Sequence, residues 1–168
     1  LPGDPAPPGA DCAGIVHVDD ERHRKFGFAL SPLASVARTL SLLVAQVPLA
    51  WTMEEASTLP TVWPTVNVVF AQSHIRARCG ALLHAATGGV GLTGVEYAQW
   101  LNLDVHGTAG RAHKHRRLQQ LGGTNRYSSR EGTTFVAGAS VKMASRRLHV
   151  VLNSLSQDFI AVSHALLA

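Results

Sequence analysis

The stretch Ala85-Ala86-Thr87-Gly88-Gly89-Val90-Gly91 decides the fold. It follows a short apolar run, Ala81-Leu82-Leu83-His84, and apolar residues with helical spacing begin near Val90. Glycines between a strand and a helix let the backbone approach a pyrophosphate, and the helix N-terminus presents unpaired N–H groups to its negative charge. Because the spacing is A-x-x-G-x-x-G rather than G-x-G-x-x-G, the interpretation as a dinucleotide site depends on its context. The alternative is a tight strand–helix turn without a ligand.

The context is a regular alternation of predicted strands and helices after Gly80. Such an alternation is typical of a parallel sheet with right-handed crossovers. Residues 80–168 therefore predict an α/β fold with a partial Rossmann-type sheet of about four strands. The predicted strands cover 81–86, 103–108, 124–127 and 148–152, and the predicted helices cover 90–101, 112–121, 133–144 and 157–167.

The first part of the chain is less regular. Residues 12–18 predict a strand, and residues 19–25 predict a polar turn. Residues 26–47 stay ambiguous, because 33–43 fit either a strand pair or a helix.

Two helices are predicted before the glycine stretch. Thr52 with Glu55 three residues later has the spacing of a capping box, which indicates a short helix starting at Met53. Residues 65–72 follow Pro64 and also predict a helix.

Composition limits the class of protein. The 168 residues are 46% hydrophobic and 15% charged, which supports a buried core and argues against disorder. The net charge of +4 is modest, and the densest basic cluster, at 111–117, is local, so we expect no general nucleic-acid surface. Cys12 and Cys79 lack metal-ligand spacing, and we expect no metal site and a reducing compartment. No signal peptide and no apolar run near 20 residues are visible, so we expect a cytoplasmic protein that does not enter membranes.

The end of the predicted second strand indicates which dinucleotide is bound. NAD sites usually place an Asp or Glu about 20 residues after the glycines. Arg111 occupies that position relative to Gly91, the strand end Thr108-Ala109-Gly110-Arg111 contains no carboxylate, and Lys114 follows one turn later. Guanidinium and ammonium groups suit a 2′-phosphate, so we interpret this as an NADP site. The alternative is that 111–117 form a solvated basic helix face.

Four segments of the chain together resemble a known family. They are Asp11-Cys12-Ala13-Gly14-Ile15-Val16, then Val47-Pro48 through Trp51-Thr52-Met53-Glu54-Glu55-Ala56-Ser57-Thr58-Leu59-Pro60, then Leu83 to Gly91, and Val150-Val151-Leu152-Asn153-Ser154-Leu155. The chain is similar to the enoyl reductase domains of polyketide synthases and animal-type fatty acid synthases. These are zinc-free members of the medium-chain dehydrogenase/reductase superfamily.

The resemblance implies an organisation and a reaction. Residues 1–50 would be a fragment of a GroES-like substrate domain, 51–79 an inter-domain helical approach, and 80–168 a partial NADPH-binding Rossmann domain. NADPH would give a hydride to the β-carbon of an α,β-enoyl thioester held on an acyl carrier protein, and a proton would reach the α-carbon. The implied partners are that carrier protein, other synthase domains and a second copy of the chain. The alternatives are a catalytically degenerate scaffold domain and a zinc-free quinone oxidoreductase.

The resemblance also assigns cofactor contacts to particular residues. Thr65 would lie near the nicotinamide; Thr87, Gly88, Gly89 and Val90 at the pyrophosphate; Gly110, Arg111 and Lys114 at the 2′-phosphate; Ser129 near the adenosine; and Asn153 toward the nicotinamide. A simple strand-end cap is the alternative for Asn153.

No proton donor follows from the resemblance. The family often has Tyr-Pro-Gly where this sequence has Leu1-Pro2-Gly3. It also has a small Ala and an aromatic residue where Val66 and Asn67 follow Thr65. His17, His84 and His106 are candidate acids by general chemistry, but the place of His84 in a buried strand favours a core histidine.

Overall fold

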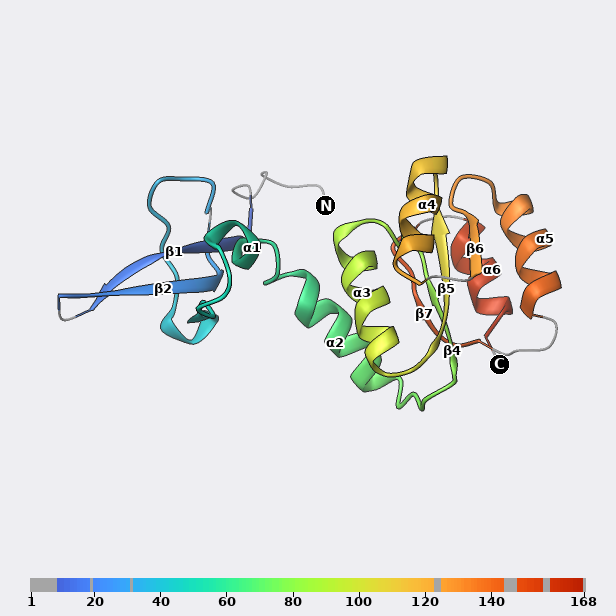
Figure 1. The fold of residues 1–168 in the computed structure, drawn as a ribbon, viewed down its shortest axis with the longest axis horizontal. Coiled ribbons are helices and arrows are strands. Elements are labelled where there is room, and N and C mark those ends of the chain that lie inside the picture. Colours follow the sequence, from blue (N-terminus) through green and yellow to red (C-terminus); the bar gives the residue numbers. More distant parts are fainter. Residues whose placement is uncertain are drawn as a thin grey trace. The chain divides into compact units, whose positions relative to one another are not determined.

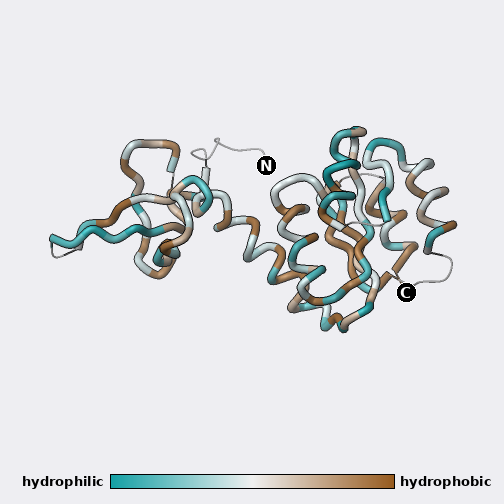
Figure 2. The backbone as a smooth tube through the Cα atoms, viewed as in Figure 1, coloured by the Kyte–Doolittle hydropathy of each residue, from teal (hydrophilic) through white to brown (hydrophobic). Residues whose placement is uncertain are grey.

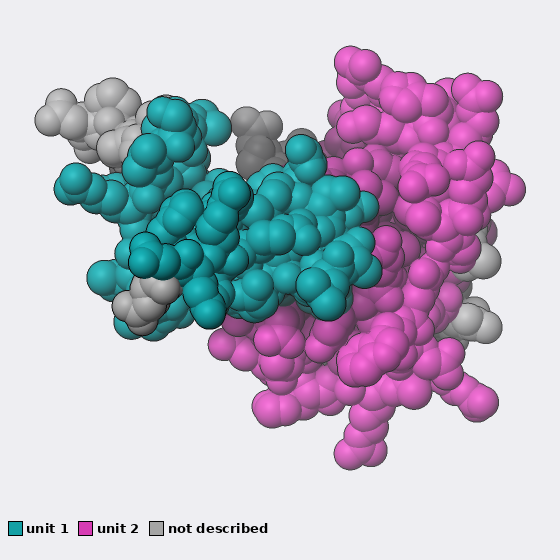
Figure 3. Space-filling model, turned by 60° about the vertical axis from the view of Figure 1, so that its left-hand side comes forward, with its two compact units in different colours: residues 1–64 teal, residues 65–168 magenta. Residues whose placement is uncertain are grey.

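The chain forms two compact units in the computed structural model (Figure 3). Unit 1 comprises residues 1–64, and unit 2 comprises residues 65–168. The division lies inside helix α2 (Val62–Gln72). The structure describes residues 9–18, 20–30, 32–122, 125–143, 148–155 and 158–167.

Unit 1 contains a small antiparallel sheet with strand order β1-β2-β3, built from β1 (Asp11–Val18), β2 (Glu21–Phe28) and β3 (Val44–Gln46). The predicted strand at 12–18 is confirmed. The predicted polar turn at 19–25 is wrong, because β2 already begins at Glu21 and pairs with β1 residue by residue. Its polar side chains are tolerated because most are exposed or half-buried rather than packed in a core. Asp19 lies outside the described residues.

The ambiguous segment 26–47 forms neither a helix nor a strand pair over 33–43. It passes through a single bridge between Leu30 and Arg38 and a short 3-10 helix, η1 (Ser41–Leu43), and then enters β3. Gly27 lets this segment lie close to β2, since a Cβ there would stand 2.0 Å from the Leu43 carbonyl oxygen.

The predicted capping box is confirmed at the start of α1 (Met53–Ser57). The Glu55 N–H donates to Thr52 Oγ1 (3.1 Å), and the Thr52 N–H donates to the Glu55 carboxylate (2.9 Å). Helix α2 starts at Val62, three residues before the predicted start. Pro64 lies in its first turn, where an N–H has no partner within the helix, so the ring costs no hydrogen bond.

Unit 2 is a four-stranded parallel sheet with strand order β6-β5-β4-β7 and a helix after each strand (Figure 1). The predicted α/β fold class with a partial Rossmann-type sheet is confirmed. Thr124 and Gln157, which begin two of the predicted elements, and Ala144, which ends a third, lie outside the described residues. The elements are β4 (Gly80–Leu83), α3 (Gly89–Trp100), β5 (Asp104–Ala109), α4 (Ala112–Gln120), β6 (Asn125–Ser128), α5 (Gly132–Met143), β7 (Leu148–Leu152) and α6 (Asp158–Ala165).

Two apolar layers cover the two faces of this sheet, because alternate strand residues point to opposite sides. Ala81 and Leu83 belong to a core with residues of α2, α3 and α4. Leu82 belongs to a second core with Phe135 of α5 and residues of α6. Hydrophobic segments follow β4 and β7 in Figure 2, whereas α4 is mostly hydrophilic. The same alternation puts His84 on the α5/α6 side.

The strand order reverses direction at β4. Strand β5 lies on one side of β4 and β7 on the other, so the loops that follow β4 and β7 meet at a topological switch point. In open α/β sheets, ligands bind outside the carboxyl ends of the strands at this point. Among the described residues, no helix has the length and apolarity to span a membrane.

Candidate cofactor site

The loop after β4 is a tight turn held against β5. The Ala86 N–H donates to the Thr108 carbonyl oxygen (2.9 Å), and the Gly88 N–H donates to the Ala85 carbonyl oxygen (2.8 Å). Ala85 adopts a left-handed conformation with φ of 48°. These bonds turn the chain from the strand into helix α3 within a few residues.

The N-terminus of α3 is left open. Gly88 is its N-cap in an extended conformation, and no side chain caps the helix. The first intrahelical bond joins the Leu92 N–H to the Gly88 carbonyl oxygen (2.8 Å). The amides of Gly89, Val90 and Gly91 precede this bond and have no carbonyl within the helix to pair with. Such an end offers several aligned N–H donors and a partial positive charge to an anion.

Gly91 sets how closely α3 approaches the loop. A Cβ at this position would stand 2.4 Å from the Ala85 carbonyl oxygen and 2.6 Å from the Ala86 Cα. Both obstacles are backbone atoms, which cannot swing aside. A side chain at Gly88 would instead meet only the Ala85 carbonyl oxygen, at 3.4 Å. The last glycine of the sequence motif therefore allows close packing, and the first one lies at the exposed helix end.

His84 ends the buried strand segment before the loop and is fully buried. Its Nε2 lies 2.7 Å from Ser163 Oγ, and its Nδ1 lies 3.3 Å from Thr108 Oγ1. Burial lowers the pKa of His84 to about 4, so the ring is neutral at neutral pH. A buried ring with both nitrogens bonded fits the core histidine favoured by the sequence rather than an exposed acid.

The basic residues follow β5 as the sequence predicts. Arg111 is the N-cap of α4, and Lys114 lies one turn further on; both side chains are exposed. No side chain caps this helix either. Leu118 is the buried residue of α4 and packs in the core, and the basic side chains lie on the exposed part of the helix. The 2′-phosphate contacts stay a prediction, because the side chains of Arg111 and Lys114 would be equally exposed on a solvated helix face that binds no ligand.

Arg130 is a candidate that the sequence argument missed. A Cβ on Gly110 would stand 3.0 Å from Arg130 Nε and 3.1 Å from Ser129 Oγ. The Ser129 N–H donates to the Ala109 carbonyl oxygen (3.1 Å), which draws the loop after β6 toward the end of β5. The structure thus brings Gly110 and Ser129 together and adds a guanidinium beside them. The only signal in the sequence was the position of Arg130 next to Ser129.

Asn153 follows β7 and is exposed. Its Oδ1 accepts a hydrogen bond from the Leu155 N–H (2.8 Å), which is the strand-end cap considered as the alternative. The adjacent Ser154 donates to the His84 carbonyl oxygen (3.1 Å), and the His84 N–H donates to the Leu152 carbonyl oxygen (3.0 Å). The loops after β4 and β7 are therefore joined at the switch point, and a cofactor contact of Asn153 stays a prediction.

Thr65 is the first residue of unit 2 and is exposed on α2. Val66 and Phe70 of the same helix are buried in the core against the sheet. Asn67, which departs from the family pattern, accepts a hydrogen bond from the Tyr97 hydroxyl (3.3 Å). A place for Thr65 beside the nicotinamide stays a prediction.

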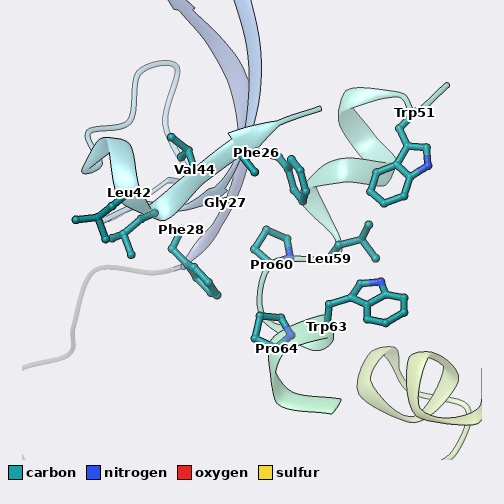
Figure 4. Close-up of a pocket in the computed structure, with 12 residues that line it drawn as sticks. Phe26, Gly27, Phe28, Leu42, Val44, Trp51, Leu59, Pro60, Trp63 and Pro64 are labelled. Atoms are coloured by element: carbon teal, nitrogen blue, oxygen red, sulfur yellow. The ribbon is translucent and has the colours of Figure 1, made fainter. Parts of the chain in front are cut away.

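Unit 1 carries an apolar pocket of about 400 Å³ that the sequence argument also missed. Figure 4 shows aromatic and proline side chains around it. Phe26 and Trp51 meet edge to face, with ring centroids 6.1 Å apart. The pocket is lined by residues of β2, η1, β3 and α2 and of the connections on either side of α1, among them Phe26, Phe28, Leu42, Pro60 and Trp63.

In the part of the chain that the structure describes, no group of three or more His, Cys, Asp or Glu side chains is placed to hold a metal ion. Cys12 and Cys79 are free thiols.

The parallel sheet, the open glycine-rich turn at its switch point and the small antiparallel unit define the class. Together they match the enoyl reductase and quinone oxidoreductase folds of the medium-chain dehydrogenase/reductase superfamily. No model of a known protein family matches the chain.

Individual relatives define the family more closely. Over 148 residues the chain is 35% identical to erythronolide synthase EryA2 of Saccharopolyspora erythraea, an alignment that covers 86% of this chain and 4% of that protein. It is 29% identical over 145 residues to the highly reducing polyketide synthase claI of Penicillium crustosum, covering 84% of this chain and 6% of that protein.

Solved structures agree with these relatives. The crystal structure of CurK enoyl reductase matches with a TM-score of 0.85 and 29% identity, covering 95% of this chain and 50% of that chain. The quinone oxidoreductase of Escherichia coli, solved in complex with NADPH, matches with a TM-score of 0.86 and 25% identity over 100% of this chain and 54% of that one. The chain belongs with the enoyl reductase domains of polyketide synthases, as the sequence resemblance implied, and spans about half the length of these solved chains.

Proposed function

We propose that this chain binds NADPH at the loop after β4 and acts in the reduction of an acyl-carrier-bound α,β-enoyl thioester to the saturated thioester within a polyketide synthase. The observation that carries the proposal is the open N-terminus of α3 above the closely packed Gly91. Similarity to polyketide synthases and to CurK enoyl reductase supports the reaction class.

The residues present fit the pyrophosphate of such a cofactor. The amides of Gly89 and Val90 lie at an exposed helix end without a side-chain cap, and the helix dipole favours negative charge there. A larger residue at Gly91 would push the helix away from the loop. Thr87 and Gly88 complete the predicted pyrophosphate loop.

The residues present also fit a 2′-phosphate. Helix α4 begins without a side-chain cap, as α3 does, at the end of the neighbouring strand. Arg130 supplies a cation beside Gly110 and Ser129, and the exposed side chains of Arg111 and Lys114 at the start of α4 are our further candidates for the phosphate. Charge-assisted hydrogen bonds of guanidinium groups to phosphate are strong, so this end of β5 favours NADPH over NADH.

NADPH, when bound, supplies the hydride for the β-carbon of the enoyl group. The chain's own part is to orient the cofactor through the loops after β4, β5 and β7 and to keep the reacting atoms out of water. Thr65 and Asn153 are our candidates at the nicotinamide. The apolar pocket of unit 1 has the chemistry to accept part of an acyl chain.

The proposed partners follow from the same reaction. They are an acyl carrier protein, other domains of the synthase and a second copy of the chain in a homodimer. A quinone oxidoreductase is the second candidate, because the NADPH complex of the Escherichia coli enzyme has a TM-score of 0.86 to this chain. Sequence similarity to polyketide synthases favours the enoyl thioester as substrate.

Cofactor titration tests the binding half of the proposal. We expect NADPH to bind at least roughly tenfold more tightly than NADH, since one charge-assisted contact contributes about 1.5 kcal/mol or more. Combined Arg111→Ala and Lys114→Ala substitutions remove most of this preference. Arg116→Ala with Arg117→Ala is the matched control on the same helix, and it leaves the preference unchanged. Equal affinities for the two cofactors in the original chain contradict the proposal.

Turnover separates the enzyme from a scaffold and from the second candidate. Crotonyl-thioester-dependent oxidation of NADPH is the expected activity, measured beside a quinone substrate under the same conditions. Activity with the quinone alone supports the quinone oxidoreductase. A chain that binds NADPH tightly but reduces neither substrate supports the scaffold.

A further inference from the structure

A chain of four hydrogen bonds runs from the cofactor loop through His84 into helix α6. At one end the Ala85 N–H donates to Thr108 Oγ1 (3.0 Å). Thr108 Oγ1 lies 3.3 Å from His84 Nδ1, and His84 Nε2 lies 2.7 Å from Ser163 Oγ. At the other end Ser163 Oγ donates to the Phe159 carbonyl oxygen (2.5 Å).

The two ends of this chain fix the direction of every proton in it. The Phe159 carbonyl can only accept, so the Ser163 hydroxyl donates to it and must accept from His84 Nε2. A neutral imidazole with its proton on Nε2 has a bare Nδ1, which accepts the Thr108 hydroxyl proton. Thr108 Oγ1 then accepts the Ala85 N–H. Each group in the chain has one matching partner, and a single tautomer of His84 satisfies them all.

Ala85, the residue at the loop end of this series of hydrogen bonds, has a strained backbone conformation. Ala85 has a φ of 48°, and a left-handed conformation costs a residue with a side chain roughly 1–2 kcal/mol. The carbonyl oxygen of Ala85 is also the atom that Gly88 and Gly91 approach. The conformation of this one residue therefore determines where the first turn of α3 begins.

Two aromatic side chains also hold the ring of His84 in place. Phe135 and Phe159 meet it edge to face, with centroid distances of 5.4 and 5.6 Å. Its main chain bonds Leu152 and Ser154 at the end of β7. Because β5, β7, α5 and α6 all contact His84, the residue is held rigidly, and its bond to Thr108 can restrict the loop.

We propose that His84 is a positioning residue for the dinucleotide: in its Nε2-protonated form it orients the Thr108 hydroxyl, which holds Ala85 in the left-handed conformation that sets the phosphate-binding amides of α3. This inference rests on the proposed function only in naming the ligand. The arm toward Thr108 reaches the loop, whereas the arm toward Ser163 anchors the ring.

Two amide substitutions separate the arms. In His84→Asn the side-chain oxygen stands near the place of Nδ1 and can accept from Thr108, whereas in His84→Gln the amide nitrogen stands near the place of Nε2 and can donate to Ser163. We expect both variants to lose thermal stability to a similar degree. We expect His84→Asn to keep the NADPH dissociation constant within about threefold, and His84→Gln to raise it by roughly tenfold.

The second buried histidine of unit 2 provides the matched control. His106 is also buried, and its Nδ1 lies 2.9 Å from the Tyr127 hydroxyl instead of a loop contact. His106→Gln should lower thermal stability and leave the NADPH dissociation constant unchanged. Thr108→Val should act like His84→Gln, and Thr108→Ser should restore binding. Equal affinities of the Asn and Gln variants at position 84, or weaker binding in His106→Gln, overturn the proposal.

Two measurements without cofactor keep this inference apart from the proposed function. Imidazole ¹⁵N chemical shifts of the original chain should show a protonated Nε2 and a bare Nδ1 on His84. Amide hydrogen exchange at residues 85–91 should speed up in His84→Gln and stay near the original rate in His84→Asn. If the original chain fails to bind NADPH, the proposed function fails while these two results still decide the role of His84. A protonated Nδ1, or equal exchange in the two variants, contradicts it.

Discussion

Helices α1 and α3 begin in opposite ways. Helix α1 has only five residues, yet Thr52 and Glu55 satisfy its first amides with their own side chains. Helix α3 has twelve residues, begins at Gly88 and has no side-chain cap. One helix end is completed by the protein itself, and the other is left available to something outside the chain.

The difference separates stability from function. A cap stabilises a helix by about 1 kcal/mol, so an end that lacks one forgoes stability unless a ligand supplies the missing acceptor. The short α1 needs its cap to form at all. The long α3 is held by its buried face, which includes Val95 and Ala98, and can remain open. Substitutions at the two helix ends, and at the residues that hold them, should therefore affect stability and cofactor binding differently.

The largest effect is expected from Gly91→Ala. The new Cβ would stand 2.4 Å from the Ala85 carbonyl oxygen, so the helix and the loop must separate. We expect a loss of about 3 kcal/mol in unfolding free energy, at the upper end of overpacking costs, and a rise of at least roughly tenfold in the NADPH dissociation constant. Urea unfolding and fluorescence titration measure the two quantities. Gly88→Ala is the control, since its Cβ makes one ordinary contact at 3.4 Å; comparable losses in both variants would show that packing at Gly91 is not special.

The next effect is a pH dependence of stability from His84. Its pKa is lowered to about 4 in the folded chain from 6.5, so the unfolded chain binds the proton more readily between these values. Stability therefore falls as the pH drops from about 6.5 to about 4, by up to about 3 kcal/mol, and this contribution is constant above and below that window. Urea unfolding at several pH values gives the slope of the unfolding free energy against pH. In this window the slope for His84→Asn should correspond to about one proton fewer than in the original chain. An identical slope in the variant would exclude His84 as the cause.

A smaller effect is expected from Arg130→Gln. If the guanidinium over Gly110 reaches the 2′-phosphate, its loss should weaken NADPH binding by roughly tenfold, about 1.5 kcal/mol, and leave NADH binding unchanged. Isothermal titration with both cofactors measures this. Arg126→Gln is the control, because Arg126 bonds the Gln119 side chain (2.6 Å) instead. A similar loss for both cofactors would place Arg130 away from the 2′-phosphate.

The smallest effect is expected at the capped helix. Thr52→Ala removes the side chain that accepts the Glu55 N–H and should lower the unfolding free energy by about 1 kcal/mol. The NADPH dissociation constant should stay the same. Thr52→Ser keeps the hydroxyl and should retain the stability. Weaker NADPH binding in Thr52→Ala would mean that the two helix ends are not as independent as proposed.

Much of unit 2, and the start of α1 in unit 1, were predictable because their signals are local. Alternating apolar segments and the glycine turn mark the strands and helices within a few residues, and the Thr52–Glu55 spacing marks the start of α1. Strand β2 was missed because Glu21 to Lys25 are polar, and their strand conformation depends on pairing with β1.

The sequence did not predict the parts of the site that depend on the order of strands in the sheet. Arg130 lies beside Gly110 only because β6 is next to β5. His84 meets Thr108 and Ser163 because β5 and α6 adjoin β4, and those residues stand 24 and 79 positions away in the sequence. Periodicity and motif spacing carry no information about contacts of that range.

The amide chemical shifts of the chain during an NADPH titration test the central claim most directly. The account predicts that the largest changes fall on Gly88, Gly89 and Val90, with a second group at Arg111, and that Met53 and Glu55 at the capped α1 do not shift. Saturating binding with unchanged shifts at the start of α3, or changes as large at α1 as at α3, would contradict it.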